Sequence, residues 1–130
     1  MSEGIQNLIE LIARLRGDGG CPWDKKQTFE SLAPYLLEET GEAIAEIEKK
    51  SPAGLCEELG DVLLIIVMLS RMAEEQGSFD FNDVVRGICE KIVRRHPHVF
   101  AGVKLDTPEE VLDNWKKIKL AEKKAAGDIQ

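Results

Sequence analysis

The sequence predicts an all-α fold, an antiparallel helical bundle of about five helices. Apolar residues recur three and four positions apart through most of its 130 residues, a spacing typical of amphipathic helices. Glycine, proline and capping residues separate these stretches. No stretch alternates apolar and polar residues in the way that would predict a strand. We expect one domain over residues 1–130, with a frayed tail over about residues 121–130.

The first helix is predicted from apolar residues at helical spacing, which are Ile5, Leu8, Ile9, Ile12 and Leu15. The glycine-rich run over residues 17–20 ends this helix, and a loop with the sequence CPWDKKQT is expected over residues 21–28.

The second and third helices are predicted to be antiparallel neighbours, because the link between them is short. The second helix begins near Thr28 and runs to about Lys49. Ser51 is the expected N-cap of the third helix, Pro52 its first residue and Gly77 its C-cap. On a helical wheel the facing stripe of the second helix holds Leu36, Thr40, Ala43, Ile44 and Ile47. The stripe of the third helix holds Leu55, Leu59, Val62, Ile66 and Ala73.

Capping residues also predict a fourth and a fifth helix. Asp80 caps the fourth helix, which ends before Pro97. The fifth helix begins at a capping box formed by Thr107 and Glu110, and we expect it to fray from Ala121.

Composition limits the partners and the cellular compartment that can be expected. A net charge of −7 argues against nucleic acid as a partner. The most apolar run, Val62 to Leu69, is too short to cross a bilayer, so no membrane partner is expected. The three cysteines follow no metal-binding spacing and are expected to be free thiols; they are Cys21, Cys56 and Cys89. With no signal peptide evident before them, a cytoplasmic protein is expected.

Two carboxylate pairs share one spacing on the second and third helices. Glu39 and Glu42 are three residues apart, and so are Glu58 and Asp61. Residues three apart share a helix face, so the four carboxylates should converge beside the apolar seam. A single pair of carboxylates at this spacing usually lies on a solvated surface. Two such pairs beside the apolar seam place more negative charge in a partly buried site than it tolerates without compensation. A bound divalent cation would compensate it.

The donor set favours magnesium or manganese. Di-iron bundles use a Glu-x-x-His motif, which the sequence lacks, and its two histidines instead flank Pro97. Zinc would require histidine or cysteine in register with the acids. Magnesium often shares its ligands with substrate phosphates, so we expect a phosphorylated small molecule as substrate.

The acidic motif is similar to the signature of the MazG nucleoside triphosphate pyrophosphohydrolases. It reads Glu38-Glu39-x-x-Glu42, then fifteen residues, then Glu58-x-x-Asp61. Further shared segments are CPWD at 21–24, RHPHVF at 95–100, and Trp115 with Ile118-Lys119. The resemblance covers about Leu8 to Lys123. It implies a MazG-like all-α bundle of two or more subunits that hydrolyses a nucleoside triphosphate to the monophosphate and pyrophosphate with Mg²⁺.

The resemblance also implies roles for individual residues. The metal ligands would be Glu39, Glu42, Glu58 and Asp61, and Glu38 joins them as a catalytic candidate. Glu38 lies about 100° from Glu39 on the wheel, so a surface position is equally compatible with the motif. Apart from the resemblance, a mostly acidic protein must supply local positive charge to bind phosphate, and the candidates for these contacts are Lys25, Lys26, Arg94, Arg95 and Lys119. Trp23 and Trp115 are expected either to stack on the nucleotide base or to pack in the core. His96 and His98 are expected to end the fourth helix.

The third helix predicts an assembly, because it is apolar nearly all round from Val62 to Leu69. Leu63 and Val67 lie off the stripe that faces the second helix, and Met68 lies off it on the other side. Leaving these side chains in water would expose a large apolar patch. We therefore expect a homo-oligomer, a dimer or a tetramer, in which a second subunit covers them.

Two other functions fit the same residues. One is a narrower enzyme for a single nucleotide, namely dCTP, dUTP or phosphoribosyl-ATP. The other is a helical interaction module that binds magnesium without turnover. The presence of acids at all four ligand positions favours an enzyme, because a site that has lost its activity tolerates losses there.

Overall fold

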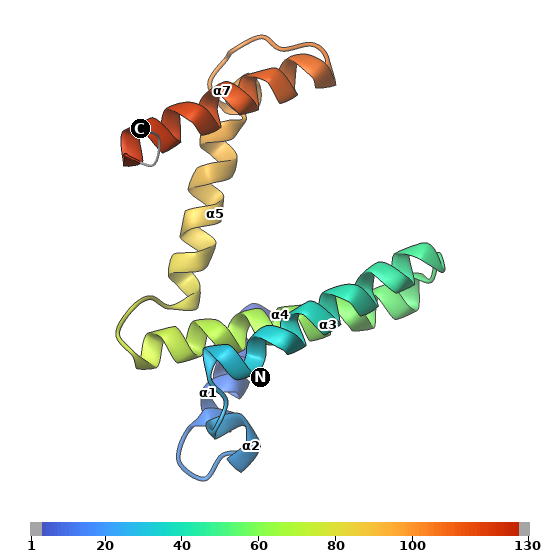
Figure 1. Ribbon diagram of the computed structural model, residues 1–130, viewed down its shortest axis with the longest axis vertical. Helices are drawn as coiled ribbons and strands as arrows, with labels where there is room; N and C mark the ends of the chain where they lie inside the picture. The colour runs from blue at the N-terminus through green and yellow to red at the C-terminus, as the bar shows by residue number, and fades with distance from the viewer. Residues whose placement is uncertain (1–3, 128–130) are drawn as a thin grey trace. The chain divides into compact units, whose positions relative to one another are not determined.

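The computed structural model describes residues 4–127, which form seven α-helices and no strand (Figure 1). The helices are α1 (Ile5–Arg16), α2 (Pro22–Lys25), α3 (Phe29–Glu48), α4 (Pro52–Glu75), α5 (Phe81–Arg95), α6 (Pro97–Phe100) and α7 (Pro108–Ala126). The predicted all-α class is confirmed. Over the described residues, no helix is both long and apolar enough to cross a membrane.

Two of these helices were not predicted: α2 lies in an expected loop, and α6 follows the expected end of the fourth helix. Each is four residues long and has proline as its first residue, Pro22 in α2 and Pro97 in α6. Proline fixes a helical φ and lacks only an N–H that the first turn of a helix leaves unpaired. The prediction of about five helices was therefore too low by these two single turns.

The chain consists of two compact units. The N-terminal unit reaches Val84, and the C-terminal unit begins at Val85, within α5. Helices α1 to α4 belong to the first unit, and α6 and α7 belong to the second. That the whole chain is one domain stays a prediction.

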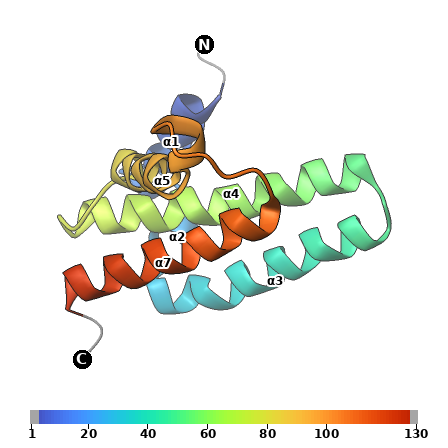
Figure 2. The same ribbon diagram turned by 90° about the horizontal axis from the view of Figure 1, so that it is seen from above.

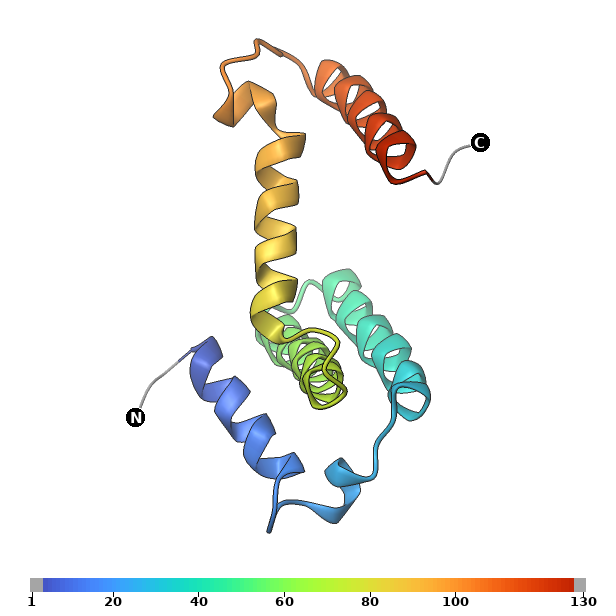
Figure 3. The ribbon, with the colours of Figure 1, turned by 90° about the vertical axis from the view of Figure 1, so that its left-hand side faces the viewer.

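Helix α4 is the centre of the N-terminal unit, with α1 on one side and α3 on the other (Figure 3). Helices α3 and α4 run antiparallel and side by side, joined by a short turn (Figures 1 and 2). The buried core comes from all three helices and holds Ile12, Leu32, Ile65, Val67, Met68 and Met72. Phe81, at the start of α5, packs against it.

The predicted stripe on α3 is only partly buried. Ala43 is buried and Leu36 packs against the core, but Ile44 and Ile47 are 49% and 58% exposed. The core lies over the first half of α3, where Leu32 is fully buried. Because α1 does not extend to the turn between α3 and α4, a two-helix layer there leaves its outer sides uncovered.

The expected caps are present. Ser51 Oγ and Thr107 Oγ1 accept from the backbone N–H three residues on, and Asp80 forms reciprocal bonds with Asp83. Gly77, at φ 75°, follows α4 in the left-handed conformation that glycine adopts without strain.

Helix α7 is longer than expected. It continues to Ala126, past Ala121, and Gly127 ends it at φ 79° with its N–H bonded to the carbonyls of Lys123 and Lys124. Two basic side chains in the last turn favour this helix end, because they oppose its negative dipole charge. The rest of the expected tail, residues 128–130, lies outside the described residues.

The chain itself covers part of the surface that was expected to need a second subunit. Val67 and Met68 are each only 2% exposed and belong to the core. The expectation that they are open was therefore wrong, because both lie in the core to which α1, α3 and α4 contribute. Leu63 is 37% exposed, so it is accessible to a second subunit.

Candidate functional site

Helices α3 and α4 bring four carboxylates together in the N-terminal unit. Glu39 and Glu42 come from α3, and Glu58 and Asp61 come from α4. One carboxylate oxygen of each lies within 4.8 Å of the others. The spacing of three residues sets each pair on one helix face. The antiparallel contact of the two helices brings those faces together.

Burial and the crowding of like charges favour the protonated forms of two of these carboxyl groups. Burial, followed by the neighbouring carboxyl group of Glu42, raises the pKa of Glu58 to about 7. Burial also raises the pKa of Glu39, with smaller contributions from the charges of Glu42 and Asp61. Both shifts oppose the charged form, so the cluster without a cation is electrostatically unfavourable.

The same atoms fit a divalent cation. Oε2 of Glu39 and Oε2 of Glu58 are buried and accept no hydrogen bond from any described residue. Buried oxygens usually have a partner. Four carboxylates without nitrogen or sulfur donors match the oxygen ligation of Mg²⁺ or Mn²⁺.

Two other glutamates of α3 lie outside the cluster. Glu38 is exposed, and its charge contributes to the raised pKa of Glu39. Glu46 lies further along α3, where Lys49 pairs with it at 3.4 Å.

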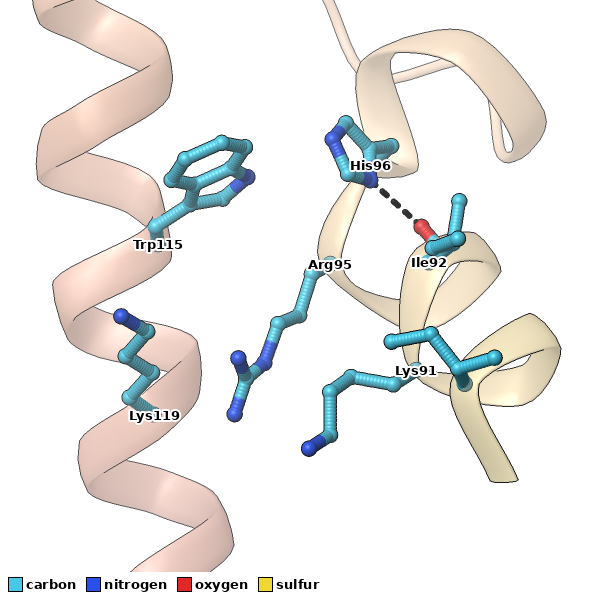
Figure 4. Close-up of a pocket in the computed structure, with 7 residues that line it drawn as sticks. Lys91, Ile92, Arg95, His96, Trp115 and Lys119 are labelled. Atoms are coloured by element: carbon cyan, nitrogen blue, oxygen red, sulfur yellow. Dashed lines mark hydrogen bonds between the residues drawn. The ribbon is translucent and has the colours of Figure 1, made fainter. Parts of the chain in front are cut away.

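The C-terminal unit contains a pocket between α5 and α7 (Figure 4). Its lining is largely cationic and aromatic and comprises Ile88, Lys91, Ile92, Arg95, His96, Trp115 and Lys119. Three of these were predicted substrate contacts, namely Arg95, Trp115 and Lys119. The structure therefore brings together predicted residues that are far apart in the sequence.

Trp115 and His96 form one wall of this pocket. Their rings meet edge to face, with centroids 5.2 Å apart. His96 Nδ1 donates to the carbonyl of Ile92 at 2.5 Å, which fixes the imidazole ring. The Nε1 of Trp115 and the Nε of Arg95 are buried donors with no acceptor among the described residues. Such donors suit a ligand that is rich in acceptor oxygens.

The remaining predicted contacts are not among the residues that line this pocket. Trp23 is 47% exposed on α2 and meets Tyr35 edge to face at 5.7 Å, so it is not a core residue. Lys25 and Lys26 are exposed beside it. Arg94 does not line the pocket but bonds to Glu122 of α7.

Sequence reasoning gave no binding role to three polar residues of the C-terminal unit. Lys91 and His96 line the pocket, and Glu122 bonds to both Arg94 and Arg95. Four-residue spacing, which places Lys91 and Arg95 on one face of α5, was a usable signal for the lysine. No local signal links Glu122 to α5, because that contact depends on how α5 and α7 pack.

Comparison with known proteins agrees with the motif. Residues 27–100 match the family described as the MazG nucleotide pyrophosphohydrolase domain, a range that contains all four carboxylates of the cluster. A crystal structure of a MazG-related protein from Thermotoga maritima matches with a TM-score of 0.72 at 30% identity. That match covers 88% of this chain and 98% of the other.

Curated relatives are closer in sequence but longer. A nucleoside triphosphate pyrophosphohydrolase of Escherichia coli (strain K12) is 47% identical over 120 residues, which is 92% of this chain and 46% of the relative. The protein YabN of Bacillus subtilis (strain 168) is 50% identical over 113 residues, 87% of this chain and 23% of the relative. The chain thus spans less than half the length of each. The family match covers more than half of the chain, so the chain belongs to the MazG nucleotide pyrophosphohydrolase domain family.

Proposed function

We propose that this chain hydrolyses ribo- and deoxyribonucleoside triphosphates to the monophosphate and pyrophosphate, with Mg²⁺ and in the cytoplasm. The physiological role would be the removal of unwanted nucleotides from the pool. The observation that carries the proposal is the convergence of four carboxylates within 4.8 Å in a member of this family. The E. coli relative is named a nucleoside triphosphate pyrophosphohydrolase, which supports the proposal.

The metal would be held by Glu39, Glu42, Glu58 and Asp61, whose unpartnered oxygens fit a hard cation. When bound, Mg²⁺ supplies positive charge against the triphosphate and makes a water more acidic. Mn²⁺, with similar ligand preferences, is expected to substitute.

The chain's own residues would bind the substrate and accept the proton. Glu38 is exposed and outside the cluster, so it is a carboxylate that is free to take the proton from the attacking water. Contacts to phosphate oxygens are assigned to Lys25, Lys26, Arg94, Arg95 and Lys119, and contacts to the base to Trp23 and Trp115.

The bond that is broken tests the proposal. Water attack at the α-phosphorus releases pyrophosphate, whereas a phosphatase releases orthophosphate. We expect monophosphate and pyrophosphate in equal amounts when the purified chain is incubated with each NTP and dNTP plus Mg²⁺. Stoichiometric orthophosphate in an assay free of pyrophosphatase would contradict the proposal.

The same assay separates the alternatives. Turnover of dCTP, dUTP or phosphoribosyl-ATP alone would indicate the narrower enzyme. Binding of Mg²⁺ with no turnover of any nucleotide would indicate a non-catalytic module.

We also propose a homo-oligomer of at least two subunits. Large apolar side chains are exposed on α3 and α4, which are Leu37, Ile44, Ile47, Leu59 and Leu63. No described residue of α6 or α7 is buried, and Ile88, Ile92 and Val93 of α5 are exposed. So much open apolar surface supports an interface with a second copy.

A further inference from the structure

The carboxylate of Glu122 on α7 binds two consecutive arginines of α5, Arg94 and Arg95. Arg94 and Arg95 are consecutive, so their side chains leave the helix about 100° apart. Arg94 Nε nevertheless donates to Glu122 Oε2 at 2.5 Å, and Arg95 Nη2 donates to Glu122 Oε1 at 2.8 Å. These bonds hold the pKa of Glu122 at about 2, so the carboxylate is charged at neutral pH.

Within residues 4–127, most N–H donors of the two guanidiniums have no acceptor. Glu122 takes one N–H from each, and each guanidinium has five. Arg95 also lines the pocket that Lys91 and Lys119 enter (Figure 4). Three cationic side chains line this pocket, and Glu122 offsets only the charge of Arg95 there, so the net positive charge that remains suits a polyanion.

We propose that Glu122 is a positioning residue for the polyphosphate of the substrate. By holding both guanidiniums beside one another, it presents them to the phosphate chain before the ligand arrives. This inference rests on the proposed function, in which both arginines contact the substrate. The long arginine side chain loses considerable rotamer freedom when a ligand orders it, and prior fixation by Glu122 reduces that loss.

Positioning and simple charge balance predict opposite effects of neutralising Glu122. If the carboxylate positions the arginines, Glu122→Gln releases at least one of them and weakens binding. We expect the KM for the nucleoside triphosphate to rise about tenfold, with kcat within about twofold. If the carboxylate only offsets positive charge, its removal strengthens attraction to the polyanion, and KM falls. An unchanged or lower KM would therefore overturn the proposal.

A background without the arginines tests whether Glu122 acts through them. In the Arg94→Ala/Arg95→Ala variant, we expect Glu122→Gln to change KM by less than about twofold, because nothing remains to be positioned. If Glu122→Gln raises KM by the same factor with and without the two arginines, the proposal is contradicted. The matched control is Asp113→Asn, which neutralises an exposed carboxylate of the same helix and should leave KM unchanged.

Binding of inorganic tripolyphosphate, measured by calorimetry, requires no turnover and separates the two proposals. Weaker binding by Glu122→Gln in a chain that releases no pyrophosphate would support the positioning role while the proposed function fails. Normal hydrolysis with unchanged tripolyphosphate affinity would overturn the positioning role alone. If the glutamine variant does not fold, Glu122→Asp keeps the charge but is one methylene too short to span both guanidiniums, so the same loss of affinity is expected.

Discussion

At the scale of single residues, the four clustered carboxylates are the most sensitive positions. Replacing Glu39, Glu42, Glu58 or Asp61 with its amide should lower kcat/KM by at least about a hundredfold, because each replacement removes a charged oxygen ligand. Steady-state release of pyrophosphate by each variant measures the loss. Glu46→Gln is the control on the same helix, since Glu46 pairs with Lys49 outside the cluster. Near-normal turnover in all four variants would contradict a metal site here.

The raised pKa of Glu58 predicts how stability depends on pH. Its value moves from the ordinary 4.5 to about 7 in the folded protein. The folded state therefore binds a proton that the unfolded state has lost, so this stabilisation is full below pH 4.5 and disappears as the pH rises through about 7. In EDTA, we expect the melting temperature to fall between pH 5 and about 8.

Two comparisons check this origin of the pH dependence. Saturating Mg²⁺ should reduce the fall, because the cation favours the deprotonated cluster. Glu58→Gln should remove most of the fall, because the amide does not titrate. A fall of the same size in Glu58→Gln would assign it to other groups.

At the scale of elements, the turn from α1 to α2 depends on the absence of a side chain at Gly20. A Cβ there would meet the backbone carbonyl oxygens of Leu15 and Arg14, which cannot move as a flexible side chain can. The Leu15 carbonyl already accepts from Cys21 N at 2.8 Å. We expect Gly20→Ala to cost about 2 kcal/mol of unfolding free energy, measured by urea denaturation.

The control for this substitution is Gly87→Ala. Gly87 lies within α5, and nothing lies within 4 Å of the position that its Cβ would take. Alanine there should stabilise the helix by about 0.5–1 kcal/mol, because it loses less backbone entropy on folding. Equal effects of the two substitutions would show that the close approach at Gly20 does not matter.

At the scale of the whole molecule, the proposed oligomer predicts a melting temperature that rises with protein concentration. Leu63→Lys should dissociate the assembly and lower activity with it, because it places a charge on the exposed apolar side of α4. Light scattering measures the mass of the variant. Gln76→Lys, at the exposed end of α4, is the control and should stay assembled. A folded, active monomer of 14.5 kDa at micromolar concentration would contradict the oligomer.

A substitution at Val67 does not test assembly. On sequence grounds this residue belonged to the subunit interface, but it is 2% exposed in the core of its own chain. Val67→Lys would bury a charge and unfold the N-terminal unit rather than separate subunits. Only exposed positions such as Leu63 are therefore informative about assembly.

The sequence by itself determined the features that depend on near neighbours in the chain. Helical periodicity predicted the five longer helices, and Ser51, Asp80 and Thr107 were recognised as caps, since a cap bonds to backbone only three residues away. The spacing of Glu39, Glu42, Glu58 and Asp61 predicted a cluster that the structure assembles. One short turn sets the pairing of α3 with α4, so little tertiary information was needed for that convergence.

Tertiary structure decided which apolar sides are covered and which distant cations meet. A helical wheel shows that Val67 and Ile44 are on apolar sides, but the shared core of α1, α3 and α4 buries the first and nothing in the described chain buries the second. Likewise, Arg95 and Glu122 are 27 residues apart, and their contact depends on the packing of α5 with α7. Hydrophobic periodicity predicts which side of a helix is buried. It does not predict which element covers that side, because this depends on packing between residues far apart in the sequence.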